Sequence, residues 1–134
     1  KGEVAGVELA SLDTVLTQSD VLSLHCPLVP ENRKMINALS LARMKAGAIL
    51  VNTARGGLID EAALANALRS GHLRSAGLDS FEQEPLTAPH AFQNIANCIL
   101  SPHIGGVTED AYIAMGTGAA QNIIEVIEAA TALV

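Results

Sequence analysis

The segment AILVNTARGGLIDEAALANAL, residues 48–68, contains the transition that decides the fold. Its first residues, Ala48–Val51, form a continuous apolar run, which is typical of a strand buried on both faces in a parallel sheet. A helix pattern follows at Glu61–Ser70, with Asp60 as its N-cap. Arg55 lies between the two, where the strand ends. A charged side chain at the end of a buried strand indicates a binding or catalytic role.

The same alternation of apolar runs and helix patterns extends on both sides of this segment. Its short connections predict an α/β fold in which about four parallel strands are joined by right-handed crossovers. The other apolar runs are Val21–Leu24, Ser75–Leu78 and Cys98–Leu100, and the other helix patterns are Ser11–Gln18, capped by Ser11, and Leu41–Ala46, capped by Ser40. A separate pattern predicts a long helix from about Thr108, its cap, to Ala130.

The composition limits the classes of partner. The chain of 134 residues has a formal net charge of −6, which argues against a nucleic-acid backbone as the main partner. It contains no run of about 18 apolar residues, so no membrane span is predicted. The two cysteines, Cys26 and Cys98, lack the spacing of metal ligands, and no metal site is predicted. Reduced cysteines favour a cytoplasmic protein.

Each predicted strand ends in polar or conformationally special residues. Ligands of an open parallel sheet bind beyond the carboxyl ends of its strands, so these residues would meet at one edge. Arginine binds a carboxylate through two hydrogen bonds, and histidine exchanges a proton near neutral pH when a carboxylate orients it. The set predicts redox or acyl chemistry on an anionic substrate. Its members are His25, Cys26 and Pro27 after the first strand, Asn52 to Gly57 after the second, Asp79 to Pro85 after the third, and Ser101 to Gly106 after the fourth.

Four collinear motifs resemble the D-isomer-specific 2-hydroxyacid dehydrogenases. NTARGGLIDEAALANAL, GLDSFEQEP and SPHIGG are similar to the three C-terminal signatures of that family, and SDVLSLHCPLVPENRKMIN is similar to the segment before them. The resemblance covers nearly the whole chain. It implies a partial Rossmann-type, doubly wound parallel sheet. It also implies reversible hydride transfer between a nicotinamide cofactor and a D-2-hydroxy or 2-keto acid, such as 3-phosphoglycerate or hydroxypyruvate. It favours NAD and leaves NADP open.

The resemblance implies a role for each matching residue. Arg55 would hold the carboxylate and carbonyl of the substrate, and His103 would protonate the carbonyl oxygen as hydride arrives. Glu84 would pair with His103; Glu82 lies nearby in the sequence, but the following proline favours Glu84. Asp79 would lie near the nicotinamide amide, or else cap a turn. The residues implied to line the cofactor are His25, Cys26, Pro27, Thr53, Ala54, Arg55, Asp79, His103, Gly105 and Gly106.

Glycines are expected where the backbone and a ligand approach closely, because glycine has no Cβ. Gly56 and Gly57 follow Arg55 and would leave room for a ligand there. Gly105 and Gly106 would do the same beside the nicotinamide.

The chain lacks two features of a complete dinucleotide-binding domain. It has no Gly-x-Gly-x-x-Gly turn for the pyrophosphate and no acidic residue placed to bind the ribose hydroxyl. Residues 1–107 are therefore expected to be the C-terminal half of such a domain, and residues 108–134 a long helix that packs toward a substrate domain. The strand Val21–Leu24 would lie at a sheet edge, so we expect a homo-oligomer or association through that edge.

Three functions stay open at this point. The first is a D-2-hydroxyacid dehydrogenase. The second is a binding module, because some relatives are NAD-sensing transcriptional corepressors that keep the same polar residues. The third is a chain that is inactive by itself because part of its site is absent. Val29, Asn32 and Ser80 depart from residues common in the family and leave the subfamily open.

Overall fold

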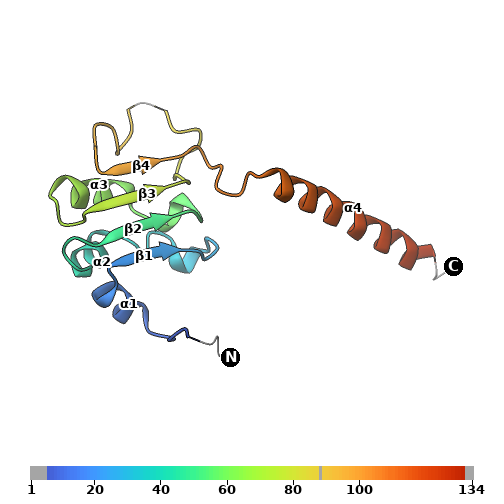
Figure 1. Cartoon of the computed structure of the whole chain (residues 1–134), viewed down its shortest axis with the longest axis horizontal. Coiled ribbons are helices and arrows are strands. Elements are labelled where there is room, and N and C mark those ends of the chain that lie inside the picture. Colours follow the sequence, from blue (N-terminus) through green and yellow to red (C-terminus); the bar gives the residue numbers. More distant parts are fainter. Residues whose placement is uncertain (1–5, 88, 132–134) are drawn as a thin grey trace. The chain divides into compact units, whose positions relative to one another are not determined.

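A four-stranded parallel sheet, in the order β1-β2-β3-β4, forms the centre of the fold (Figure 1). The computed structural model describes residues 6–87 and 89–131. The strands are β1 (Val21–Leu24), β2 (Ile49–Asn52), β3 (Ser75–Leu78) and β4 (Cys98–Leu100). All four predicted strands are confirmed, with β2 starting and ending one position later, and β1 lies at an edge as expected.

Three helices alternate with the first strands, and two of their predicted N-caps are confirmed. The helices are α1 (Leu12–Gln18), α2 (Ala38–Arg43) and α3 (Glu61–Arg69). Ser11 Oγ accepts a hydrogen bond from the Thr14 N–H at 3.1 Å, and Asp60 Oδ1 accepts one from the Ala63 N–H at 3.1 Å. Each bond satisfies a backbone donor of the first helical turn and contributes about 1 kcal/mol.

Helix α2 is present but begins and ends three residues before the predicted Leu41–Ala46, so the predicted bounds and cap are wrong. Its N-cap is Asn37 and not Ser40, because Asn37 Oδ1 accepts a hydrogen bond from the Ser40 N–H at 3.2 Å. In return, Ser40 Oγ accepts one from the Asn37 N–H at 2.7 Å. This reciprocal pair is a capping box, in which the serine occupies the third helical position and not the cap.

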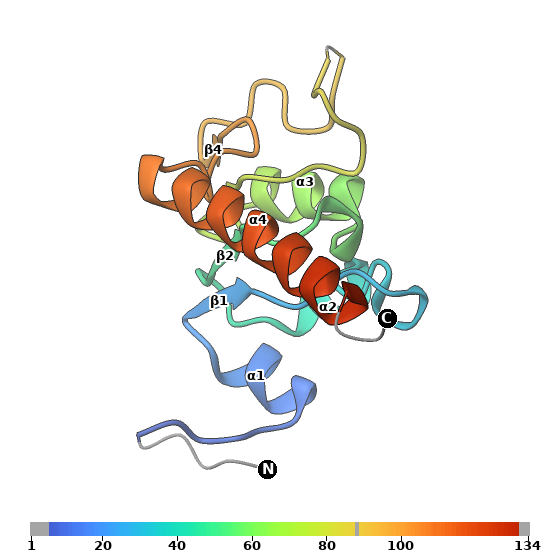
Figure 2. The same ribbon diagram turned by 90° about the vertical axis from the view of Figure 1, so that its right-hand side faces the viewer.

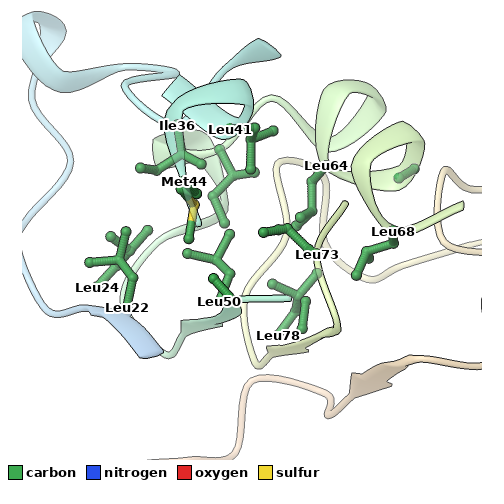
Figure 3. Close-up of a cluster of buried hydrophobic side chains, with 14 of the residues drawn as sticks. Leu22, Leu24, Ile36, Leu41, Met44, Leu50, Leu64, Leu68, Leu73 and Leu78 are labelled. Carbon is green, nitrogen blue, oxygen red and sulfur yellow. The ribbon is translucent and has the colours of Figure 1, made fainter. Parts of the chain in front are cut away.

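The core lies between one face of the sheet and helices α2 and α3 (Figure 3). Residues of β1, β2 and β3 alternate between buried and more exposed, which is the pattern of a sheet with one covered face. The predicted burial of the strands on both faces is therefore wrong for the described residues. Leu50 of β2 and Leu64 of α3 are fully buried. Burial of one such side chain contributes about 1.5–3 kcal/mol. The side chains labelled in Figure 3 are Leu22, Leu24, Ile36, Leu41, Met44, Leu50, Leu64, Leu68, Leu73 and Leu78.

The opposite face of the sheet carries apolar side chains that stay exposed. Val21 is 58% exposed and Ile99 is 77% exposed. The register pairs Ser23, Val51, Gly77 and Ile99 across the sheet, which puts Ile99 on the same face as Val21. The predicted Rossmann-type α/β fold is confirmed. A doubly wound sheet has helices on both faces. In the described residues up to His103, helices pack on one face of the sheet.

The connection from β3 to β4 contains no helix in its described residues, 79–87 and 89–97. It is the yellow-to-orange loop in Figure 2. Two buried rings, Phe81 and Phe92, anchor it, with ring centroids 6.4 Å apart. This loop is therefore tied to the core although it lacks regular secondary structure, and it carries Glu84.

The chain forms two compact units, residues 1–103 and 104–134. The second unit contains the predicted long helix, α4 (Glu109–Thr131). Thr108 is its cap as predicted, since the Ala111 N–H donates to Thr108 Oγ1 at 3.1 Å. Several large apolar side chains of α4 are exposed, among them Ile113 and Ile123. None of the helices within the described ranges is long and apolar enough to cross a membrane.

Candidate active site

The loop after β2 positions Arg55 through a buried amide. Asn52, the last residue of β2, is fully buried. Its Nδ2 donates to the Arg55 carbonyl at 3.0 Å, and its Oδ1 accepts from the Ala54 N–H at 3.0 Å. The Arg55 guanidinium donates through Nη1 to the Ala54 carbonyl at 2.7 Å and is otherwise exposed. Asn52 therefore fixes the backbone from which Arg55 projects.

The glycines after Arg55 serve first to pack two loops together. A Cβ on Gly56 would lie 1.9 Å from the backbone carbonyl carbon of Phe81, and one on Gly57 would lie 2.7 Å from Leu28 Cδ2. Both glycines belong to a 3₁₀ turn, Gly56–Leu58. The missing Cβ at Gly56 thus lets the backbone of Phe81 come close. That Gly56 also brings the backbone close to a ligand stays a prediction, and Gly56 lines the pocket described below.

The predicted pairing of Glu84 with His103 is present. His103 Nδ1 lies 2.8 Å from Glu84 Oε2, and Glu84 Oε1 accepts a hydrogen bond from the Phe81 N–H at 2.8 Å. These two bonds, that of Phe81 first, hold the pKa of the Glu84 carboxyl below its ordinary value. Glu82 is engaged elsewhere, with Arg33 at 2.8 Å. Glu84 is therefore the acid that orients the histidine.

The carboxylate also selects the histidine tautomer. An ionised Glu84 only accepts hydrogen bonds, so the proton of a neutral His103 ring resides on Nδ1 and Nε2 is left for a ligand. The backbone of His103 has a φ of 56°, in the left-handed region that is costly for residues with a Cβ. Backbone strain of this kind is found mostly at functional sites, where the surrounding structure holds the residue in its strained conformation.

Arg55, Glu84 and His103 line one pocket of about 270 Å³. The three side chains come from the loops after β2, β3 and β4, so the carboxyl ends of three neighbouring strands meet there as the sequence predicts. The other lining residues are Leu28, Arg33, Gly56, Gly57, Phe81 and Glu82. A cation, an acid and a histidine in one small pocket can bind an anion and move a proton beside it.

A second cleft, of about 380 Å³, lies at the carboxyl ends of β1 and β2. Six of the residues expected to line a cofactor come together in it: His25, Cys26, Pro27, Thr53, Ala54 and Arg55. His25 Nε2 lies 2.8 Å from Ser23 Oγ. Arg55 lines both the cleft and the pocket. The position and size of the cleft fit one portion of a dinucleotide, with a small substrate in the neighbouring pocket. Open parallel sheets bind such ligands at the carboxyl ends of their strands.

The other predicted cofactor residues are not among those that line this cleft, and one of them, His103, lines the pocket. Asp79 is buried, and its Oδ1 accepts a hydrogen bond from Ser101 Oγ at 2.6 Å, which joins the ends of β3 and β4. Gly105 and Gly106 belong to the second compact unit. In the described part of the chain, no group of three or more histidine, cysteine, aspartate or glutamate side chains is arranged to hold a metal ion.

Sequence reasoning did not single out Asn52 as a positioning residue. Its signal was a polar residue at the end of a buried strand, directly before the loop that carries Arg55. A polar side chain that is fully buried must find hydrogen-bond partners, and here the partners are the loop backbone.

Comparison with known proteins identifies the family. Residues 1–105 match a family model described as "D-isomer specific 2-hydroxyacid dehydrogenase, NAD binding domain". The chain is 46% identical to the D-3-phosphoglycerate dehydrogenase of Mycobacterium tuberculosis over 118 residues, which are 88% of this chain and 22% of that protein. It is 43% identical to the glyoxylate reductase of Aeropyrum pernix over 119 residues, which are 89% of this chain and 36% of that protein.

A solved structure agrees with both relatives. The fold superposes on the crystal structure of the TT0316 protein from Thermus thermophilus with a TM-score of 0.89 and 41% sequence identity, covering 96% of this chain and 41% of that one. The chain thus spans about a fifth to two fifths of the length of these proteins. It belongs to the D-isomer-specific 2-hydroxyacid dehydrogenase family, as part of the NAD-binding domain.

Proposed function

We propose that the protein is a D-2-hydroxyacid dehydrogenase that interconverts a 2-hydroxy acid and its 2-keto acid, with Arg55, Glu84 and His103 in the reaction. The observation that carries this proposal is the 2.8 Å contact between His103 Nδ1 and Glu84 Oε2 in the pocket that Arg55 also lines. The cofactor supplies or accepts the hydride, and the protein binds the acid and manages the proton.

Arg55 holds the substrate in this proposal. A 2-keto acid presents a carboxylate and an adjacent carbonyl, and a guanidinium can donate to both at once. The side chain is exposed, and its one hydrogen bond within the described residues goes to a backbone carbonyl. An arriving carboxylate therefore displaces no ion pair and gains a charge-assisted bond.

His103 moves the proton. In the reductive direction, the protonated ring donates from Nε2 to the carbonyl oxygen, which becomes the hydroxyl of the product. In the oxidative direction, the neutral ring takes that proton back. The Glu84 carboxylate is hydrogen-bonded to Nδ1 and stabilises the protonated ring. Nε2, on the other side of the ring, therefore faces away from Glu84.

The cleft at the ends of β1 and β2 is the proposed cofactor site, where the backbone at Cys26, Pro27, Thr53 and Ala54 would contact the dinucleotide. Asp79, Gly105 and Gly106 remain proposed contacts of the nicotinamide. The free thiols of Cys26 and Cys98 support a cytoplasmic location, which is also part of the proposal.

The test is NADH-dependent reduction of glyoxylate and hydroxypyruvate by the full-length protein, with Arg55→Gln as the variant. We expect Arg55→Gln to lower kcat/KM by about 10-fold to 100-fold, as the loss of charge-assisted hydrogen bonds does. Arg74→Gln, at an exposed arginine outside both the pocket and the cleft, is the matched control and should keep the wild-type value. Absence of any NADH consumption by the wild-type protein with both of these acids and with 3-phosphohydroxypyruvate contradicts the proposal.

A further inference from the structure

We propose that Arg33 is a second anion-binding residue of the pocket that holds Arg55, and that the preferred substrate carries a second anionic group beyond its carboxylate. This inference rests on the proposed function and deepens it by naming the substrate class. Arg33 lines the pocket, but the proton and hydride chemistry does not use it. It enters the pocket from the segment after β1, whereas Arg55 comes from the loop after β2.

The Arg33 side chain is held in place by Glu82. Its Nη2 donates to Glu82 Oε1 at 2.8 Å. Glu82 is itself anchored, because its backbone N–H donates to Glu61 Oε1 at 2.7 Å. An arginine tied at one nitrogen loses less conformational freedom when its other nitrogens bind a ligand, so the pair prepares Arg33 for binding.

The other terminal nitrogen of Arg33 lies along the pocket wall. Nη1 is 3.5 Å from the position that a Cβ on Gly57 would occupy, and Gly57 lines the same pocket. Glu82 does not neutralise Arg33 alone, since its Oε2 lies 3.5 Å from Lys34 Nζ. The single carboxylate is shared by two cations, and donors of Arg33 remain for an anion.

The backbone fixes the separation between the two arginines. The Lys34 N–H donates to the Gly57 carbonyl at 2.8 Å, which ties the segment of Arg33 to the turn that follows Arg55. Lys34 adopts a φ of 52°, in the left-handed region, which is an unfavourable backbone conformation that the surrounding contacts must stabilise. Arg33 and Arg55 are thus presented by two segments that are hydrogen-bonded to each other.

The charged residues of the pocket indicate the class of substrate. Glu82 and Glu84 both line it, so a second anionic group there needs its own cation, and Arg33 supplies one. A volume of about 270 Å³ has room for a small acid. The fitting class is a short 2-hydroxy or 2-keto acid with a phosphate, sulfonate or second carboxylate at its far end.

The experiment compares two 2-keto acids on the full-length protein with NADH: glyoxylate, which has one anionic group, and 3-phosphohydroxypyruvate, which has two. The variants are Arg33→Gln and Arg33→Lys, with Arg74→Gln as the matched control. We expect Arg33→Gln to raise the KM for 3-phosphohydroxypyruvate by about 10-fold to 100-fold, the cost of one charge-assisted hydrogen bond, and to change the KM for glyoxylate far less. Arg33→Lys should restore part of the loss, because it keeps the charge.

The outcomes separate this inference from the proposed function. An equal loss with both acids, or no loss with either, overturns the role of Arg33 and leaves the dehydrogenase activity standing. A wild-type protein that reduces glyoxylate better than 3-phosphohydroxypyruvate also overturns the inference alone. A wild-type protein that reduces neither of these acids nor hydroxypyruvate contradicts the proposed function and the inference with it.

Discussion

Single residues decide how the proposed site works, and the Glu84–His103 pair is the clearest case. The sequence predicts the pairing through its resemblance to a known family, and the hydrogen bond is present at 2.8 Å. Periodicity alone could not have chosen Glu84 over Glu82, because both lie in a loop without regular structure. The choice is set by the Phe81 N–H, which holds one Glu84 oxygen and leaves the other for His103.

This pair should give the protein a pH-dependent stability. The pKa of Glu84 is lowered in the folded state, so its contribution is present above the unfolded value and is lost as pH falls through the folded value. We expect Glu84→Gln to be less stable than wild type at neutral pH, with a difference that shrinks as pH falls below about 4. Urea unfolding across a pH series measures it.

The control for this prediction is Glu31→Gln, at an exposed glutamate for which the described residues show no ion pair. Its stability relative to wild type should change little across the same series. A Glu84→Gln deficit that is constant from neutral to acidic pH would show that ionisation of Glu84 does not matter.

At the scale of elements, the strands were predictable and the turns between them were less so. Apolar runs predicted all four strands, because residues on the exposed face, such as Val21 and Ile99, are apolar as well as those in the core. The start of α2 was mispredicted because Asn37 and Ser40 are both good capping residues, and only their mutual hydrogen bonds assign the cap. The role of Gly56 depends on a contact with Phe81, which is distant in sequence, so local pattern could not reveal it.

Gly56 provides a test of how the two loops pack. Gly56→Ala should lower the free energy of unfolding by about 1–3 kcal/mol, because a Cβ there would lie 1.9 Å from the Phe81 backbone, which cannot move aside as a side chain can. Gly77→Ala is the matched control, since a Cβ at Gly77 meets nothing within 4 Å. Chemical denaturation of both variants gives the comparison, and equal effects would contradict the packing argument.

At the scale of the whole molecule, exposed apolar surface predicts self-association. The strand β1 is an edge of the sheet, and Val21 and Ile99 on the uncovered face are 58% and 77% exposed. Edges and apolar patches of this kind attract further chains. We expect the 134-residue chain to form dimers or larger species in sedimentation velocity as its concentration rises. A single monomeric species over the whole concentration range would contradict this.

The residues proposed to select the substrate could be predicted from the sequence only in part. Motifs brought Arg55, Glu84 and His103 to attention because each stands in a distinctive stretch. Arg33 also stands in a family-like segment, residues 19–37, but the resemblance gave it no role. It joins the pocket through the fold, by way of Glu82 and the turn at Gly57. Specificity of this kind arises from tertiary contacts and not from local pattern.

The proton transfer by His103 is tested most directly by the turnover of His103→Ala in the full-length protein, measured as NADH consumption at saturating glyoxylate or hydroxypyruvate. NADH affinity, measured by calorimetry on the same variant, shows whether the cofactor site is intact. The proposed proton transfer predicts a fall in kcat of about 10²–10⁴-fold with NADH affinity close to wild type. A kcat equal to that of wild type would remove His103 from the reaction and contradict the proposed mechanism.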